Sequence, residues 1–102
     1  MNVIEFKATL KAKRPPLNIH PLLTALWYDA KGDWNKAHLI TQEILTPEAS
    51  RVHAYLHRKE GDMLNAEYWH RHAGTNLPEV TIEEEWELLV EKMLSVQTAN
   101  DL

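Results

Sequence analysis

The stretches LTALWYDAKGDWNKA at residues 23–37 and VHAYLHRKEGDMLNA at residues 52–66 share one pattern, 29 positions apart. In each, an apolar segment with helical spacing leads into Gly-Asp, and an alanine follows four residues after the aspartate. Glycine is favoured just past the end of a helix, and aspartate is favoured as the cap of the next one. The pattern therefore predicts a helix-turn-helix hairpin that is used twice.

The segments on either side of the two copies extend this prediction to an all-α chain. Asn2 with Glu5 and Thr81 with Glu84 have the spacing of capping boxes, and Pro15-Pro16 separates the first helix from the rest. Alternating strand patterns are missing from the sequence. We expect a single domain over residues 1–102, made of an N-terminal helix within 1–14, hairpins over 20–45 and 47–74, and an amphipathic C-terminal helix over 81–97.

Composition excludes several classes of function. The formal net charge of −4 argues against a nucleic-acid partner, since phosphate contacts need a basic surplus. The chain has no cysteine, which excludes disulfides, thiolate metal sites and cysteine nucleophiles. It has no signal-peptide pattern and no apolar run long enough for a bilayer, so we expect no membrane partner and a cytoplasmic location.

The segment VHAYLHRKEGD at 52–62, continued by Asn65-Ala66 and Tyr68-Trp69, resembles a family of short uncharacterised bacterial proteins with a nearly identical core. The stretch GDWNKAH at 32–38 and Gln42 fit the same resemblance. The hairpin spacing also resembles tetratricopeptide-like repeats, although it is shorter than their period of about 34 residues. The resemblance implies the helical-hairpin fold and carries no known activity.

Histidines provide one hypothesis about function. His53 and His57 are four residues apart and share a helix face, with Glu60 on the next turn. Two imidazoles and a carboxylate form a facial ligand set for zinc or another divalent metal. Apart from such a metal ion, we expect no cofactor. The alternative, which we favour, is that the histidines hydrogen-bond between helices or face solvent, because no His-Glu-x-x-His signature is present.

Charge provides a second hypothesis. Basic side chains gather in the second copy, and a pocket between them is suited to a carboxylate or phosphate. These side chains are Arg51, His53, His57, Arg58, Lys59, His70, Arg71 and His72. The last helix is acidic, so the favoured reading is that it packs beside the basic hairpin and neutralises it internally.

The leading hypothesis is a protein- or peptide-binding module with its groove between the hairpins. Most of the aromatic residues are expected in the core, but Trp34 directly follows a helix cap and is expected to be exposed. The candidate contacts are Trp34, Tyr55, His57, Arg58, Trp69 and Arg71. The rival is a metal- or small-anion-binding protein, or an enzyme, centred on His53, His57 and Glu60. No catalytic residue is assigned, because no nucleophile or phosphate-loop motif occurs.

Two hairpins are few for a stable stack, so a homodimer is a further expectation.

Overall fold

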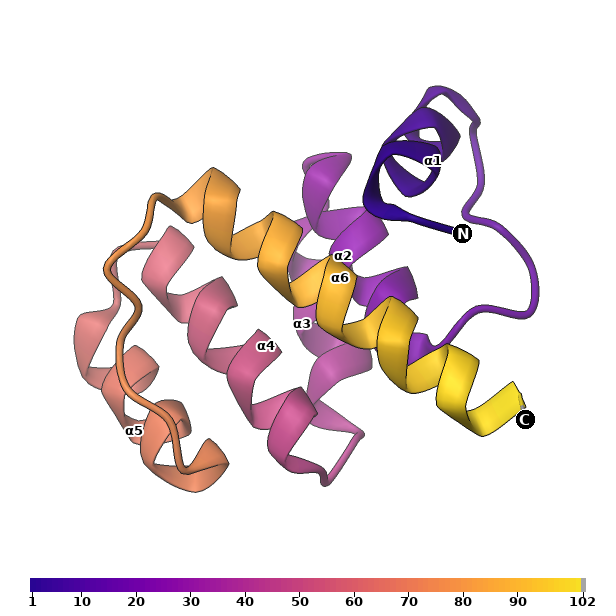
Figure 1. Ribbon diagram of the computed structural model, residues 1–102. Helices are drawn as coiled ribbons and strands as arrows, with labels where there is room; N and C mark the ends of the chain where they lie inside the picture. Colours follow the sequence, from indigo (N-terminus) through magenta and orange to yellow (C-terminus); the bar gives the residue numbers. More distant parts are fainter. Residues whose placement is uncertain (102) are drawn as a thin grey trace.

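The computed structural model describes residues 1–101, and the side chains of residues 1–99. Over this part the chain is all-α and contains no strand, as predicted. The elements are α1 (Val3–Ala8), a 3₁₀ turn η1 (Thr9–Lys11), α2 (Pro21–Ala30), α3 (Trp34–Gln42), α4 (Pro47–Lys59), α5 (Met63–Ala73) and α6 (Ile82–Asp101) (Figure 1). None of these helices combines the length and apolar character that a membrane span requires.

The two predicted hairpins are α2–α3 and α4–α5, and their turns are built alike. Gly32 and Gly61 have φ angles of +89° and +86°, in the region that glycine adopts without a side-chain clash. The carboxylates of Asp33 and Asp62 then accept hydrogen bonds from the backbone amide three residues later, which caps α3 and α5. In both turns the aspartate amide also donates to the carbonyl five residues earlier.

The N-terminal helix is shorter than the predicted 1–14. The Asn2–Glu5 capping box is present, but the α-helix ends at Ala8 and only the η1 turn follows. Phe6 is the one residue of α1 that is buried, so the first segment lacks the apolar stripe that would hold a longer helix in place. Lys31, just after α2, donates to the carbonyls of Leu10 and Ala12 and so stabilises this early ending.

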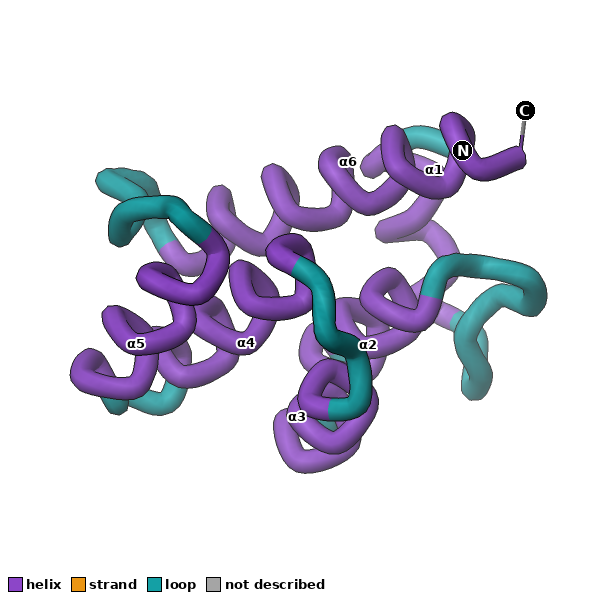
Figure 2. The backbone as a smooth tube through the Cα atoms, turned by 90° about the horizontal axis from the view of Figure 1, so that it is seen from below, coloured by secondary structure: helices purple, strands orange, loops and turns teal. Residues whose placement is uncertain are grey.

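The core lies between α2, α4 and α6, with α1 closing one side. Figure 2 shows α6 running along one side of both hairpins, with α3 and α5 away from it. Trp86 of α6 donates its indole N–H to the carbonyl of Leu26, which fixes α6 against the first hairpin. Ala37 and Ala66 are fully buried one turn into α3 and α5, where small side chains allow the paired helices to approach closely. The hairpins therefore form one packed unit covered by the terminal helices.

Candidate metal centre

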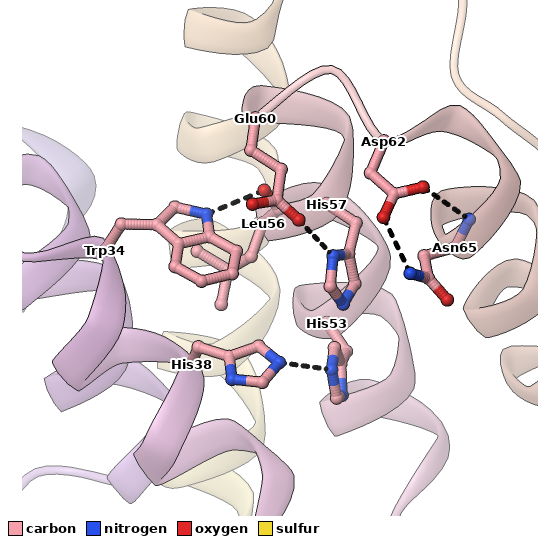
Figure 3. Close-up of polar contacts among 8 residues, drawn as sticks. All are labelled: Trp34, His38, His53, Leu56, His57, Glu60, Asp62 and Asn65. Atoms are coloured by element: carbon pink, nitrogen blue, oxygen red, sulfur yellow. Dashed lines mark hydrogen bonds and ion pairs between the residues drawn. The ribbon is translucent and has the colours of Figure 1, made fainter.

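Three histidine side chains meet where the first hairpin packs against the second. His38 comes from α3, and His53 and His57 come from consecutive turns of α4 (Figure 3). One ring nitrogen from each residue lies within 4.8 Å of the other two. The Nε2 atoms of His38 and His53 are 2.9 Å apart, so one ring donates a hydrogen bond to the other. His38 was not among the ligands expected from the sequence, which were His53, His57 and Glu60.

Trp34 holds His38 in place. Asp33 caps α3, so Trp34 occupies its first position and His38 follows one turn later on the same face. The two rings are stacked, with centroids 4.9 Å apart and an interplanar angle of 9°. The indole Nε1 of Trp34 donates to the carbonyl of Leu56 in α4, at 2.8 Å. Trp34 is therefore half-buried and bound to α4, and the expectation that it would be exposed was wrong.

Trp69 of α5 holds the second histidine. Its ring stacks on His53 with centroids 3.9 Å apart and planes 11° apart, and His53 is 6% exposed. On another side His53 stacks against His57, with centroids 5.0 Å apart. Aromatic contacts of this kind fix the orientation of a ring as well as burying it. The centre is therefore walled by one tryptophan from each hairpin.

Glu60 orients the third histidine. Its Oε1 atom lies 2.6 Å from Nδ1 of His57, which is 9% exposed. A proton on Nδ1 that is donated to this carboxylate leaves Nε2 with its lone pair, and the second ring nitrogen points toward His53 (Figure 3). A carboxylate in this position orients a metal-binding histidine. Glu60 therefore contacts Nδ1 of His57 and lies outside the three-nitrogen group, whereas the sequence hypothesis had it as a third ligand beside His53 and His57.

A second group of potential ligands shares His57 with the first. It consists of His57, Glu60 and Asp62, whose ligand atoms also lie within 4.8 Å of one another. The two carboxylate oxygens of Asp62 already accept hydrogen bonds from the backbone and side-chain amides of Asn65. These bonds lower the pKa of Asp62. Since its acceptors are engaged in capping α5, this group is less suited to a metal than the three histidines.

Two of the three histidines, His38 and His53, have a lowered pKa. Burial, together with the neighbouring His38 and His57, lowers the pKa of His53 to about 4. Burial also lowers the pKa of His38, with His57 acting in the same direction and Glu60 opposing it. A neutral imidazole is the form that binds a metal ion. Near neutral pH, His38 and His53 are therefore already in that form.

The six candidate contacts for a peptide do not form one surface. Tyr55 is 2% exposed and its hydroxyl donates to Asp29, so its ring belongs to the core and offers little surface to a peptide. His57 is one of the three histidines of the candidate centre, and Trp34 and Trp69 pack against these histidines. Arg71 is exposed on α5. The remaining contact, Arg58, is engaged inside the molecule.

Arg58 shows the internal neutralisation that the charge pattern predicted. Its guanidinium contacts Oε1 of Glu85 in α6 at 2.7 Å and also donates to the carbonyl of Val80. Glu85 is buried, so the arginine is its compensating charge. Lys59 instead pairs with Asp29 at 3.0 Å. These two cations are therefore used within the fold, and neither is available to an anionic ligand without breaking an ion pair.

Comparisons with known proteins give no match, whether the chain is compared with protein-family models, with curated proteins or with solved structures. The resemblance to short bacterial proteins and to tetratricopeptide-like repeats therefore stays a prediction.

Proposed function

We propose that this protein binds a divalent transition-metal ion through His38, His53 and His57. The observation that carries the proposal is the convergence of three buried or half-buried imidazole nitrogens within 4.8 Å. A zinc–nitrogen bond is about 2.0–2.1 Å long, so ligands in a tetrahedral site are roughly 3.3 Å apart. Small rotations of the rings close the site around an ion, and they separate the 2.9 Å pair by a few tenths of an ångström.

The donor set indicates which ions suit the site. Three imidazoles favour zinc, copper, nickel and cobalt, whereas magnesium and calcium prefer oxygen ligands. Three protein ligands leave a fourth position of a tetrahedral ion open to water or a small ligand. The contacts of Trp34, Trp69 and Glu60 support the proposal, because each one restricts the orientation of a different histidine ring.

Metal binding at this place would join the two hairpins. His38 belongs to α3, whereas His53 and His57 belong to α4. The ion would therefore replace one hydrogen bond across the interface with three coordinate bonds that span it. This couples the affinity for the metal to the packing of the hairpins, in the way that metal binding couples to folding elsewhere.

The proposal is tested by titrating the chelator-treated protein with Co²⁺ and recording its visible absorption, then displacing Co²⁺ with Zn²⁺. We expect one ion per chain and a spectrum typical of four-coordinate nitrogen ligation. Replacing any of the three histidines with alanine should weaken binding at least tenfold. His72→Ala is the matched control, since His72 is exposed on α5 and outside the cluster. Binding that is unchanged in all three variants, or equally lost in His72→Ala, would overturn the proposal.

A further inference from the structure

A separate cavity of about 360 Å³ lies where the ends of α2 and α4 meet η1 and the start of α6. Its volume is at the lower end of the range for small-molecule sites. The uncharged part of the wall is apolar and aromatic, and it consists of Leu10, Ala30, Tyr55, Ile82 and Trp86. None of the three clustered histidines lines it. The cavity is therefore independent of the candidate metal centre.

The charges around this cavity do not balance. Lys7 and Lys59 line it together with Asp29, Glu83 and Glu87. Lys7 pairs with Glu87, and Lys59 pairs with Asp29. Among the side chains that the structure describes, Glu83 has no ion-pair partner. The lining thus carries one uncompensated negative charge at the edge of an apolar space.

The ion pairs of the lining favour the same sign of ligand. Tyr55 and Trp86 contribute to the apolar wall, and these residues are only 2% and 7% exposed. An anion would have to displace a carboxylate from Lys7 or Lys59 and would be repelled by Glu83. A cation gains Glu83 without breaking either ion pair.

We propose that this cavity binds a small organic cation, namely a primary ammonium group on an apolar or aromatic body. The ammonium group contacts Glu83 at the rim, and the apolar body packs against Ile82 and Trp86. A body of about the size of one phenyl ring with a two-carbon arm fits the volume. Specificity then comes from the sign of the charge, because the apolar wall accepts a neutral or anionic analogue of equal shape just as well.

The test compares 2-phenylethylamine with 3-phenylpropanoate and 3-phenylpropanol, which share the aromatic body but differ in charge. Chemical shifts of the ¹⁵N-labelled protein are followed with a chelator present, so that the metal centre takes no part. We expect saturable shifts of the Trp86 indole N–H with a dissociation constant of about 1 mM or tighter for the amine. The carboxylate and the alcohol should bind at least tenfold more weakly. Two results would overturn the proposal. One is that the carboxylate binds as tightly as the amine, and the other is that the amine causes no shift at 10 mM, which is roughly ten times the expected dissociation constant.

A matched pair of variants locates the charge that selects the ligand. Glu83→Gln should weaken amine binding about fivefold or more, because it removes the uncompensated carboxylate but keeps the side-chain shape. Glu84→Gln should leave the affinity within about twofold, since Glu84 is exposed on the same helix but does not line the cavity. Both sites are exposed, so both variants are expected to fold. Equal affinities in the two variants contradict the assignment.

Discussion

The Nε2 atoms of His38 and His53 lie 2.9 Å apart, although the two imidazoles belong to different hairpins. Such a contact needs one ring to carry a proton on Nε2 and the other to present its lone pair. Both nitrogens are able to ligate a metal ion once the proton of the donor ring moves to its Nδ1 atom, because Nε2 of each neutral ring then presents a lone pair. The same pair of atoms thus holds the hairpins together without metal and, in our proposal, with it.

A metal ion should raise the thermal stability of the protein. Zn²⁺ at a concentration 100 times its dissociation constant adds about 2.7 kcal/mol to the free energy of unfolding if only the native state binds it. For a domain of this size that corresponds to a rise in Tm of roughly 10–20 °C. Circular-dichroism melts with Zn²⁺ and with chelator measure the rise. At the same Zn²⁺ concentration, His38→Ala should reduce the rise to about half or less, and an equal rise in that variant would show that the ion binds elsewhere.

Glu60→Gln should weaken metal binding without unfolding the chain. The carboxylate is partly exposed, so its neutral isostere is tolerated, but it accepts the Nδ1 proton of His57 less strongly. Loss of an orienting carboxylate typically costs 10–100-fold in metal affinity. Glu67→Gln, at an exposed position of α5, is the control and should bind as the wild type does. Equal affinities in the two variants would remove Glu60 from any positioning role.

Acid should destabilise the metal-free protein over a defined range of pH. The pKa of His53 is about 4 in the folded state against 6.5 for an ordinary histidine, so the unfolded chain binds more protons between these values. Stability is therefore complete above about pH 6.5 and falls by roughly 1–3 kcal/mol as pH drops toward 4. The lowered pKa values of His38 and His70 act in the same direction. Urea unfolding at a series of pH values measures how steeply the free energy of unfolding depends on pH. This dependence should be shallower in His53→Asn, and an unchanged dependence would show that His53 does not cause it.

The buried hydrogen bond between Tyr55 and Asp29 should contribute measurably to stability. Tyr55→Phe leaves Oδ2 of a 2% exposed carboxylate without this donor, at a cost of about 1–3 kcal/mol. Tyr28→Phe is the control, since the hydroxyl of Tyr28 makes no hydrogen bond with the side chains or backbone that the structure describes. Chemical denaturation measures both. Equal effects would mean that the phenol of Tyr55 acts only by packing.

Ala66→Leu should disturb the second hairpin. Ala66 is fully buried between α4 and α5, and a larger side chain there forces the two helices apart, at about 1–3 kcal/mol. Glu67→Leu introduces the same side chain at the next, exposed position and should change stability by less than about 0.5 kcal/mol. Denaturation midpoints compare the two variants. A neutral Ala66→Leu would contradict the close approach of these helices.

The helix ends could be predicted because their causes are local. Gly32 and Gly61 end one helix of each hairpin, and the aspartate after each glycine begins the next through a bond to an amide three residues away. The C-terminal extent of α1 was harder to predict, because the segment after it contacts Lys31, a residue that follows α2 in the sequence. Sequence reasoning succeeds where the deciding contact lies within one turn of the residue concerned.

The candidate site was predictable only in part for the same reason. The spacing of His53 and His57 places them on one face of a single helix, which a sequence can show. The position of His38 depends on how α3 rotates against α4, and that rotation is decided by contacts such as the one between Trp34 and the Leu56 carbonyl. A tryptophan one turn before a histidine was the only local signal. Long-range pairings of this kind leave almost no trace in a single sequence.

The ion pairs of Asp29 and Arg58 have a consequence for the number of hairpins. These two residues occupy equivalent positions of the two copies, 29 residues apart, yet they carry opposite charges. Asp29 bonds to Tyr55 and Lys59 of the following hairpin, whereas Arg58 bonds to Glu85 of α6. The first hairpin thus pairs its charge with the second hairpin, and the second hairpin pairs its charge with the C-terminal helix α6. The charge at this position therefore limits the array to two hairpins. An inserted copy of the first hairpin would leave Asp29 without its partners Tyr55 and Lys59, and an inserted copy of the second would separate Arg58 from Glu85.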